Sequence, residues 1–121
     1  MSTFITEIED ETLILIPQTS ISSLARGDVG TELAAVLEQI QQQHVRHVVI
    51  DLGKVDYFGS LMLAMMHALY KSVCVNGGTV VLCNVSEVGR EVLRASRFDT
   101  LWAVRPSRSD ALQWVEQGMR G

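Results

Sequence analysis

The chain has 121 residues, of which 47% are hydrophobic and 20% are charged, and its formal net charge is −4. This length suits one domain with a single core, and the apolar fraction is too high for a disordered chain. The negative charge disfavours binding to nucleic acid or to an anionic membrane surface. The sequence has neither a secretory leader nor an apolar run of about 18 residues. We therefore predict a single cytoplasmic domain over residues 1–121, with no nucleic-acid or membrane partner.

The N-terminal part of the chain predicts a β-hairpin. Residues 4–9 alternate between apolar and polar side chains, and residues 12–16 form an apolar, β-branched run. Asp10-Glu11 lies between them as a short turn, and Pro17 ends the second strand because it has no N–H to donate.

A helix and a central strand are expected next. Apolar residues recur on one helical face, at Leu33, Val36, Leu37 and Ile40. The segment 45–52 follows, and its continuous apolar run at 48–50 is typical of a strand covered on both faces. A second helix is expected to begin near Ser60 and to end before the Gly77-Gly78 turn.

The remaining segments predict a strand at 79–83, a third helix capped by Ser86, a short strand at 102–104 and a last helix over 107–119. The third helix carries Val88, Val92 and Leu93. Strands that alternate with single helices favour parallel neighbours joined by right-handed crossovers. The fold class is therefore α/β, with a mixed sheet of four to five strands and about four helices.

The start of the second helix is the most informative position for function. At helical spacing, one face of this helix carries a stripe expected to be buried: Met62, Met65, Met66, Leu69 and Val73. Ser60, Ala64, His67 and Lys71 fall on the opposite face, and Leu61 and Leu63 beside it are expected to be at least half exposed. The Ser60 hydroxyl could simply cap the first turn. It could also accept a phosphate, because a helix N-terminus favours an anion.

The sequence predicts no catalytic residues. His67 lies seven residues beyond Ser60, hence about 10 Å along the helix, whereas a general base must come within about 3 Å of its proton. Asp51, Asp56 and Asn84 could gather near the strand ends. The paired acids and late lysine of a receiver-type pocket are missing, and no glycine-rich phosphate loop is present.

Metal, cofactor and disulfide chemistry are not predicted either. His44 and His47 straddle a helix–strand junction, and no third ligand is evident nearby. Cys74 and Cys83 lie inside apolar patterns, so we interpret both as buried free thiols in a reducing compartment.

Three stretches of the chain resemble STAS domains of anti-sigma factor antagonists. They are residues 47–60, residues 77–93, and the pair 98–101 and 109–112, and the resemblance covers roughly residues 4–116. Members of this family typically carry Asp-Ser-Ser/Thr-Gly at the mouth of the helix, and a cognate anti-sigma kinase phosphorylates the first serine. Here the four residues are Gly59-Ser60-Leu61-Met62. Ser60 aligns with the phosphorylated serine, but the acid, the second hydroxyl and the glycine are missing. The family's Gly-Glu-Leu-Asp-like turn is replaced by residues 17–20.

The resemblance implies a STAS-like domain that binds an anti-sigma factor of the serine-kinase type and is not an enzyme. It makes Ser60 the candidate phosphorylation site. The surface expected to contact the partner comprises Asp56, Tyr57, Gly59, Ser60, Leu61, Leu63, Ala64 and His67. One alternative is a non-phosphorylated STAS scaffold that partners a larger assembly such as a transporter ATPase, and a further one is a small nucleotide-binding protein. The leucines beside Ser60 could also serve a homodimer.

Overall fold

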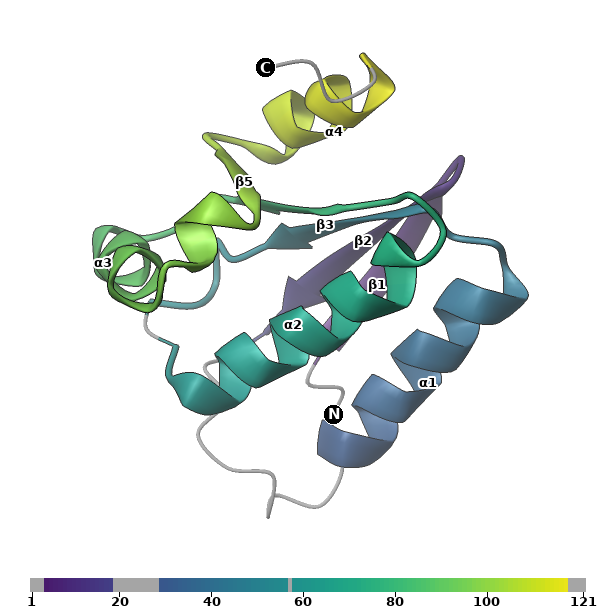
Figure 1. Ribbon diagram of the computed structural model, residues 1–121, viewed down its shortest axis with the longest axis horizontal. Helices are drawn as coiled ribbons and strands as arrows, with labels where there is room; N and C mark the ends of the chain where they lie inside the picture. The colour runs from purple at the N-terminus through teal and green to yellow at the C-terminus, as the bar shows by residue number, and fades with distance from the viewer. Residues whose placement is uncertain (1–3, 19–28, 57, 118–121) are drawn as a thin grey trace.

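The computed structural model describes residues 4–18, 29–56 and 58–117, and Figure 1 shows the arrangement of their helices and strands. In chain order the elements are β1 (Phe4–Glu9), β2 (Thr12–Pro17), α1 (Val29–Gln42), β3 (His47–Asp51), α2 (Ser60–Cys74), β4 (Val80–Cys83), α3 (Glu87–Ser96), the short 3-10 helix η1 (Phe98–Thr100), β5 (Ala103–Arg105) and α4 (Arg108–Glu116).

The five strands form one mixed sheet in the order β1-β2-β3-β4-β5. β1 and β2 are antiparallel, as expected for the hairpin, and Pro17 is the last residue of β2. Strands β2 to β5 are parallel neighbours. Because β3 is the third of the five strands in this order, it lies at the centre of the sheet. The predicted fold class is confirmed. Because β2, β3 and β4 run in the same direction, their carboxyl ends meet at one edge of the sheet, where α2 begins.

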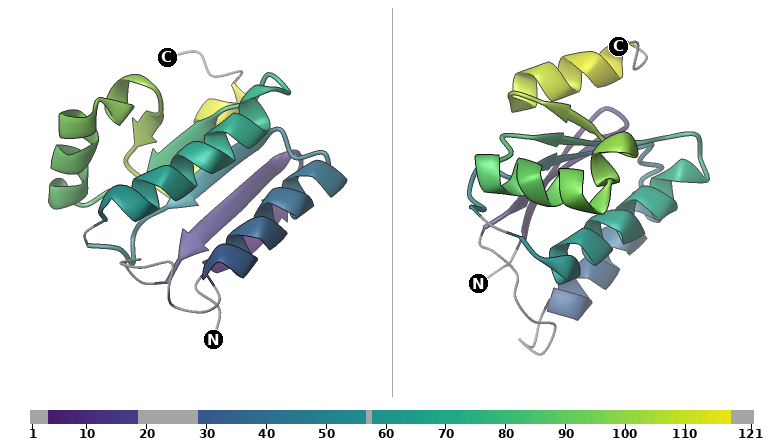
Figure 2. Two further views of the ribbon diagram at one scale, coloured as in Figure 1. Left: turned by 60° about the horizontal axis from the view of Figure 1, so that its bottom comes forward. Right: turned by 60° about the vertical axis from the view of Figure 1, so that its left-hand side comes forward.

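Helices cover both faces of the sheet, with α1 and α2 on one face and α4 on the other (Figure 2). The larger core lies under α1 and α2, and it includes the whole predicted stripe of α2. The smaller core lies under α4 and joins Ala111 to five residues of the sheet: Ile14, Ile16, Val49, Val81 and Cys83. No helix in the described part of the chain is both long and apolar enough to cross a membrane.

The two cysteines differ in their surroundings. Both are free thiols, and Cys83 is buried as expected, but Cys74 is exposed, so the prediction of its burial is wrong. Cys74 follows the buried Val73 by one residue, and this step of about 100° turns its side chain away from the core. Burial, assisted by the charge of Asp51, raises the pKa of Cys83 to about 12. The Cys83 thiol therefore stays protonated at neutral pH.

The start of β3 contains a buried histidine that couples stability to pH. Nδ1 of His47 accepts a hydrogen bond of 3.3 Å from the backbone N–H of Thr79, and a protonated imidazole has no acceptor. Burial, followed by the charge of Arg46, lowers the pKa of His47 from its usual 6.5, against a smaller opposing effect of Glu11. At a pH below the usual histidine pKa of 6.5, the imidazole is therefore protonated more readily in the unfolded chain than in the folded protein.

We therefore expect the free energy of unfolding to fall as the pH drops below about 6.5, and to level off once folded His47 is also protonated. Urea denaturation at about pH 7.5 and about pH 5.5 measures this loss. His47→Asn keeps an acceptor near the Nδ1 position and does not titrate in this range, so its loss should be smaller. An equal loss in both proteins would show that His47 is not the titrating group.

Candidate functional site

Ser60 is the first residue of α2 and its side chain is exposed. The N-cap of this helix is Gly59, in an extended conformation with φ −108° and ψ −161°, and no side chain caps the helix. The interpretation of Ser60 as the capping residue is therefore wrong, because the cap position falls one residue earlier. The side chain of Ser60 is thus exposed at the first turn without a capping role.

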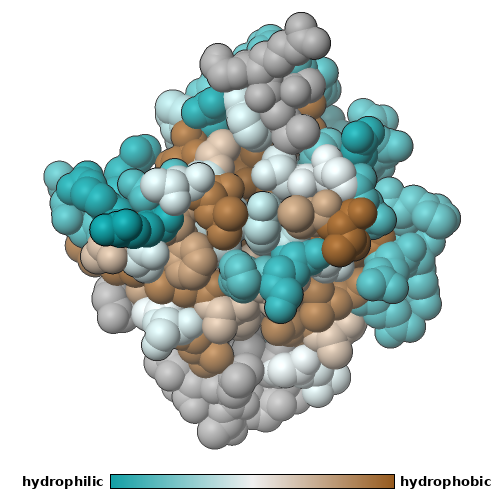
Figure 3. Space-filling view, viewed as in Figure 1, coloured by the Kyte–Doolittle hydropathy of each residue, from teal (hydrophilic) through white to brown (hydrophobic). Residues whose placement is uncertain are grey.

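The exposed face of α2 is less apolar than the sequence suggested. Ala64 and Lys71 are exposed as expected, but Leu61 and Leu63 are only partly exposed and both pack against the main core, so the expectation that they are at least half exposed is wrong. α1 packs against α2, and the ring of Phe98 in η1 lies 5.9 Å from that of His67, so the neighbouring elements cover more of α2 than its most hydrophobic stripe. Figure 3, drawn from the same side as Figure 1, shows apolar surface interrupted by polar side chains.

Aromatic rings border this face on the side of η1. His67 is partly buried, with its ring centroid 6.3 Å from that of Tyr70 and 5.9 Å from that of Phe98. Phe98 in turn stacks on Trp102 at 4.5 Å. His67 is therefore held by packing at the border of the surface. Tyr57, also predicted for this surface, lies outside the described residues.

The loop between β3 and α2 is anchored to α3. Phe58 is buried, with 1% of its surface exposed, whereas the side chain of Asp56 is exposed. The backbone carbonyl of Asp56 accepts a 2.7 Å hydrogen bond from the Ser86 hydroxyl. The same hydroxyl accepts a 3.0 Å bond from the N–H of Gly89 and so caps α3, as predicted. These contacts fix the loop that leads into Ser60.

Gly89→Ala tests this anchoring. A Cβ at position 89 would lie 2.8 Å from Cε1 of Phe58 and 2.9 Å from Cγ1 of Val85, closer than real Cβ contacts. The Phe58 ring would have to move, so we expect a loss of about 1–3 kcal/mol of stability in spite of the better helix propensity of alanine. Denaturation in urea measures this loss of stability. A Gly89→Ala variant more stable than the wild type would contradict the close packing of Phe58 against position 89.

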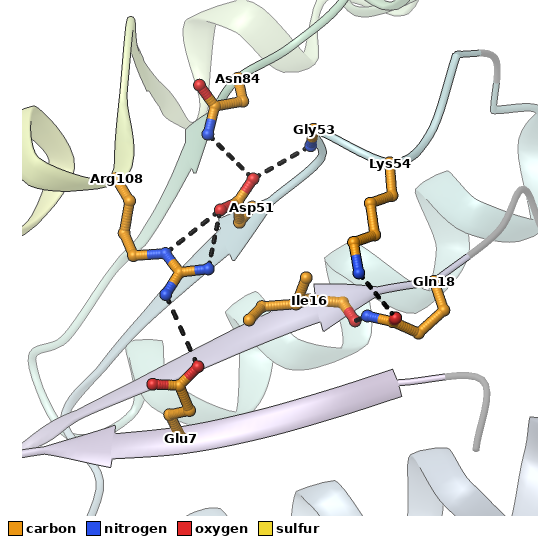
Figure 4. A network of polar contacts seen from close by, with 8 residues as sticks. All are labelled: Glu7, Ile16, Gln18, Asp51, Gly53, Lys54, Asn84 and Arg108. Carbon is orange, nitrogen blue, oxygen red and sulfur yellow. Dashed lines mark hydrogen bonds and ion pairs between the residues drawn. The ribbon is translucent and has the colours of Figure 1, made fainter. Parts of the chain in front are cut away.

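A network around Asp51 joins the strand ends to α4 (Figure 4). Asp51 Oδ1 accepts hydrogen bonds of 3.0 Å from Asn84 Nδ2 and from the N–H of Gly53. Oδ2 accepts bonds of 3.2 and 3.0 Å from Nε and Nη2 of Arg108. Arg108 Nη1 also lies 3.5 Å from Glu7 Oε2. One buried carboxylate thus holds the loops after β3 and β4 and the first turn of α4.

Sequence reasoning anticipated part of this network. Asp51 and Asn84 meet as suggested. Asp56 does not join them, since its side chain is exposed and its backbone carbonyl binds Ser86 instead. Arg108 and Glu7 were missed. A cation in the first turn of a helix is electrostatically unfavourable, and this was the one available signal that Arg108 has an acidic partner.

The charge of Asp51 is maintained by its neighbours. Burial by itself raises the pKa of this carboxyl group, and the hydrogen bonds from Asn84 and Gly53 lower it. The hydrogen bond and charge of Arg108 act in the same direction, so the pKa of Asp51 lies below its usual value. An ionised carboxylate paired in this way supports the fold of the edge. At the same edge, Lys54 donates to Gln18 Oε1 at 3.1 Å, which ties the loop to the end of β2.

The two histidines near β3 do not form part of a ligand cluster. His44 is exposed, while His47 is buried and bound to Thr79. Within residues 4–18, 29–56 and 58–117, no three His, Cys, Asp or Glu side chains are grouped so that they could hold a metal ion.

The sequence profile of the STAS domain matches residues 5–111. The chain belongs to the STAS domain family. This STAS domain is 32% identical over 102 residues to BtrV of Bordetella bronchiseptica, a candidate anti-sigma factor antagonist, and the match covers 84% of each chain. It is thus a STAS domain with homology to anti-sigma factor antagonists.

Solved structures show the same fold. TM1081 of Thermotoga maritima, a candidate anti-sigma factor antagonist, has a TM-score of 0.81 and 20% identity over 93% of this chain and 94% of its own. The anti-sigma factor antagonist SpoIIAA in its unphosphorylated form has a TM-score of 0.78 and 17% identity over 98% and 99%. SpoIIAA from Bacillus has also been solved in its phosphorylated form, with a TM-score of 0.66 and 16% identity over 93% and 98%.

Proposed function

We propose that this STAS domain binds an anti-sigma factor of the serine-kinase type, and that phosphorylation of Ser60 releases it. The observation that carries the proposal is the position of Ser60, which is exposed at the first turn of α2 and free of a capping role, in a chain homologous to anti-sigma factor antagonists. The existence of SpoIIAA in phosphorylated and unphosphorylated forms supports this type of switch.

The physical basis of the switch lies in the difference between the free and the bound domain. The open N–H groups and the dipole of α2 tolerate a phosphate on Ser60, so the free domain keeps its fold. A partner packed over this surface would have to bury a dianion, which is costly. The proposed contact surface consists of Asp56, Tyr57, Gly59, Ser60, Leu61, Leu63, Ala64 and His67. In this role the domain is a cytoplasmic binding module and performs no catalysis.

Mass spectrometry of the intact protein tests the phosphorylation. The purified domain is incubated with a purified anti-sigma factor of the serine-kinase type and with Mg-ATP. The proposal expects one added phosphoryl group on the wild type and none on Ser60→Ala. Ser60→Ala should still bind the anti-sigma factor, because it adds no charge to the surface. A phosphoryl group on another residue, or none on the wild type, would contradict the proposal.

Gly59 offers a sharper experiment, because the resemblance implies that an acid belongs at this position. Gly59 occupies the N-cap in an extended conformation, which aspartate also adopts. Gly59→Asp should therefore fold normally and be phosphorylated faster than the wild type. Gly59→Asn supplies the same cap without the charge, and it should not gain this rate. Equal rates in all three proteins would show that the acid does not take part in recognition.

A non-phosphorylated STAS scaffold is the second candidate function. It is favoured by the sequence Gly59-Ser60-Leu61-Met62, which retains only the serine of the family motif. In this case the wild type gains no phosphoryl group, and its partner, for example a transporter ATPase, binds wild type and Ser60→Asp equally. Calorimetry with ATP and GTP tests the remaining alternative of a small nucleotide-binding protein.

A further inference from the structure

A pocket of about 460 Å³ lies between α3, η1 and β5, outside the surface proposed for the partner. Its lining consists of Arg90, Leu93, Arg94, Asp99, Trp102, Ala103, Val104 and Arg105. This volume falls within the range of small-molecule sites, which is about 300–1,000 Å³. No residue of the proposed partner surface contributes to it. The pocket is thus a separate feature of the molecule.

The lining is strongly basic in a chain that is acidic as a whole. Three arginines and one aspartate line the pocket, whereas the net charge of the chain is −4. Arg90 and Arg94 are exposed and lie four residues apart on α3, where like charges repel each other. Arg94 lies 3.1 Å from Glu91 in an ion pair, but both side chains are 67% exposed and such pairs are weak. An anion between the arginines would relieve their repulsion.

The third arginine is held in place by the protein. The guanidinium of Arg105 lies over the ring of Trp114, 5.0 Å from its centroid, and donates to the carbonyl of Val104 at 3.2 Å. These two contacts reduce the freedom that Arg105 would lose on binding a ligand. They engage only part of its five N–H donors, so further donors remain for an anion.

Trp102 adds an unused polar group to the same lining. Only 2% of its surface is exposed, and its indole N–H is buried without a hydrogen-bond partner in the described part of the chain. Buried N–H groups nearly always have a partner, and the indole N–H groups of Trp102 and Trp114 both lack one among the described residues. The stacked ring of Phe98 at 4.5 Å fixes the orientation of the Trp102 indole.

We propose that this pocket binds a small molecule through a phosphate group. A phosphate offers several oxygens at tetrahedral angles, and these can accept from more than one guanidinium group of a lining that contains Arg90, Arg94 and Arg105. The site is a binding site and performs no chemistry on the ligand. It does not depend on the role of Ser60, so either proposal can fail without the other.

Pyrophosphate is a suitable probe, titrated into the folded chain at constant ionic strength and followed by calorimetry. We expect saturable binding that weakens at least tenfold in the Arg90→Gln/Arg94→Gln double variant, in which both substituted side chains are exposed. Arg97→Gln removes an exposed charge beside the same helix but outside the lining, and it should bind as the wild type does. In a Trp114→Phe background, Trp102 is the remaining tryptophan, and its fluorescence should change on the same titration curve.

Three results would overturn the proposal. The first is a heat or fluorescence signal that does not saturate as pyrophosphate is added, and the second is equal affinity of the double variant and the wild type. The third is a loss of affinity in Arg97→Gln as large as in the double variant, which would indicate unspecific charge attraction. Citrate titrated in the same way tests the ligand class. Citrate that binds as tightly as pyrophosphate would overturn the assignment to phosphate.

Discussion

Replacing Ser60 with aspartate is expected to weaken binding of the anti-sigma factor at least tenfold, which corresponds to about 1.4 kcal/mol. Ser60 is exposed at the start of α2, and the added carboxylate would lie in the middle of the proposed contact surface. Without the partner the same charge faces open N–H groups of the helix, so the free energy of unfolding should change by no more than about 1 kcal/mol. Calorimetry or surface plasmon resonance measures the binding, and urea denaturation measures the stability.

Two controls separate charge from shape at this position. Ser60→Ala removes the hydroxyl without adding charge and should bind within a factor of about three of the wild type, since one exposed hydroxyl contributes little. Lys71→Asp makes a larger acidic change, of two charge units, on the same helix but outside the proposed surface, and it should still leave binding nearly unchanged. If Ser60→Asp binds as well as the wild type, the phosphorylation switch is excluded.

Gly78→Ala is expected to lower the free energy of unfolding by about 3 kcal/mol or more. A Cβ at this position would lie 1.5 Å from the carbonyl oxygen of Arg46 and 3.1 Å from that of Val73. Both neighbours are backbone atoms, so the turn between α2 and β4 would have to move away from the start of β3. Urea denaturation measures the loss of free energy of unfolding directly, provided that the dependence of this free energy on urea concentration is the same in both proteins.

Gly77→Ala is the matched control in the same turn. Gly77 has φ +77°. A Cβ added at this position would have the end of the Arg46 side chain as its nearest neighbour, at 3.7 Å. This substitution therefore costs only the strain of the left-handed backbone, about 1 kcal/mol. Equal losses at both glycines would indicate that the close approach to Arg46 is not what requires Gly78.

The order and type of the elements could be predicted from the sequence because they depend on local patterns. The helical spacing of apolar residues in α2 identified its buried stripe, from Met62 to Val73, without error. The unbroken apolar run in β3 identified a strand covered on both faces, and Ser86 was recognised as a cap. In each case the residues that decide the structure lie within a few positions of one another.

The site itself depended on contacts between distant parts of the chain. Leu61 and Leu63 are more buried than their helical positions suggested, since the neighbouring elements extend over the side of α2. The carboxylate of Asp51 binds Arg108, which lies 57 residues further along the chain. The periodicity of apolar residues in the sequence does not indicate such a pair. The same is true of the contact between Phe58 and Gly89.

By itself, the sequence determined the α/β architecture, the central position of β3 and the placement of Ser60 at the tip of a helix. Only the tertiary structure decided that Gly59 rather than Ser60 occupies the cap, that Asp51 is ion-paired, and which arginines share a pocket with Trp102. The physical reason is that hydrophobic periodicity records which side of an element is buried. Hydrogen bonds and ion pairs depend instead on distances of a few ångströms between segments that the fold alone brings together.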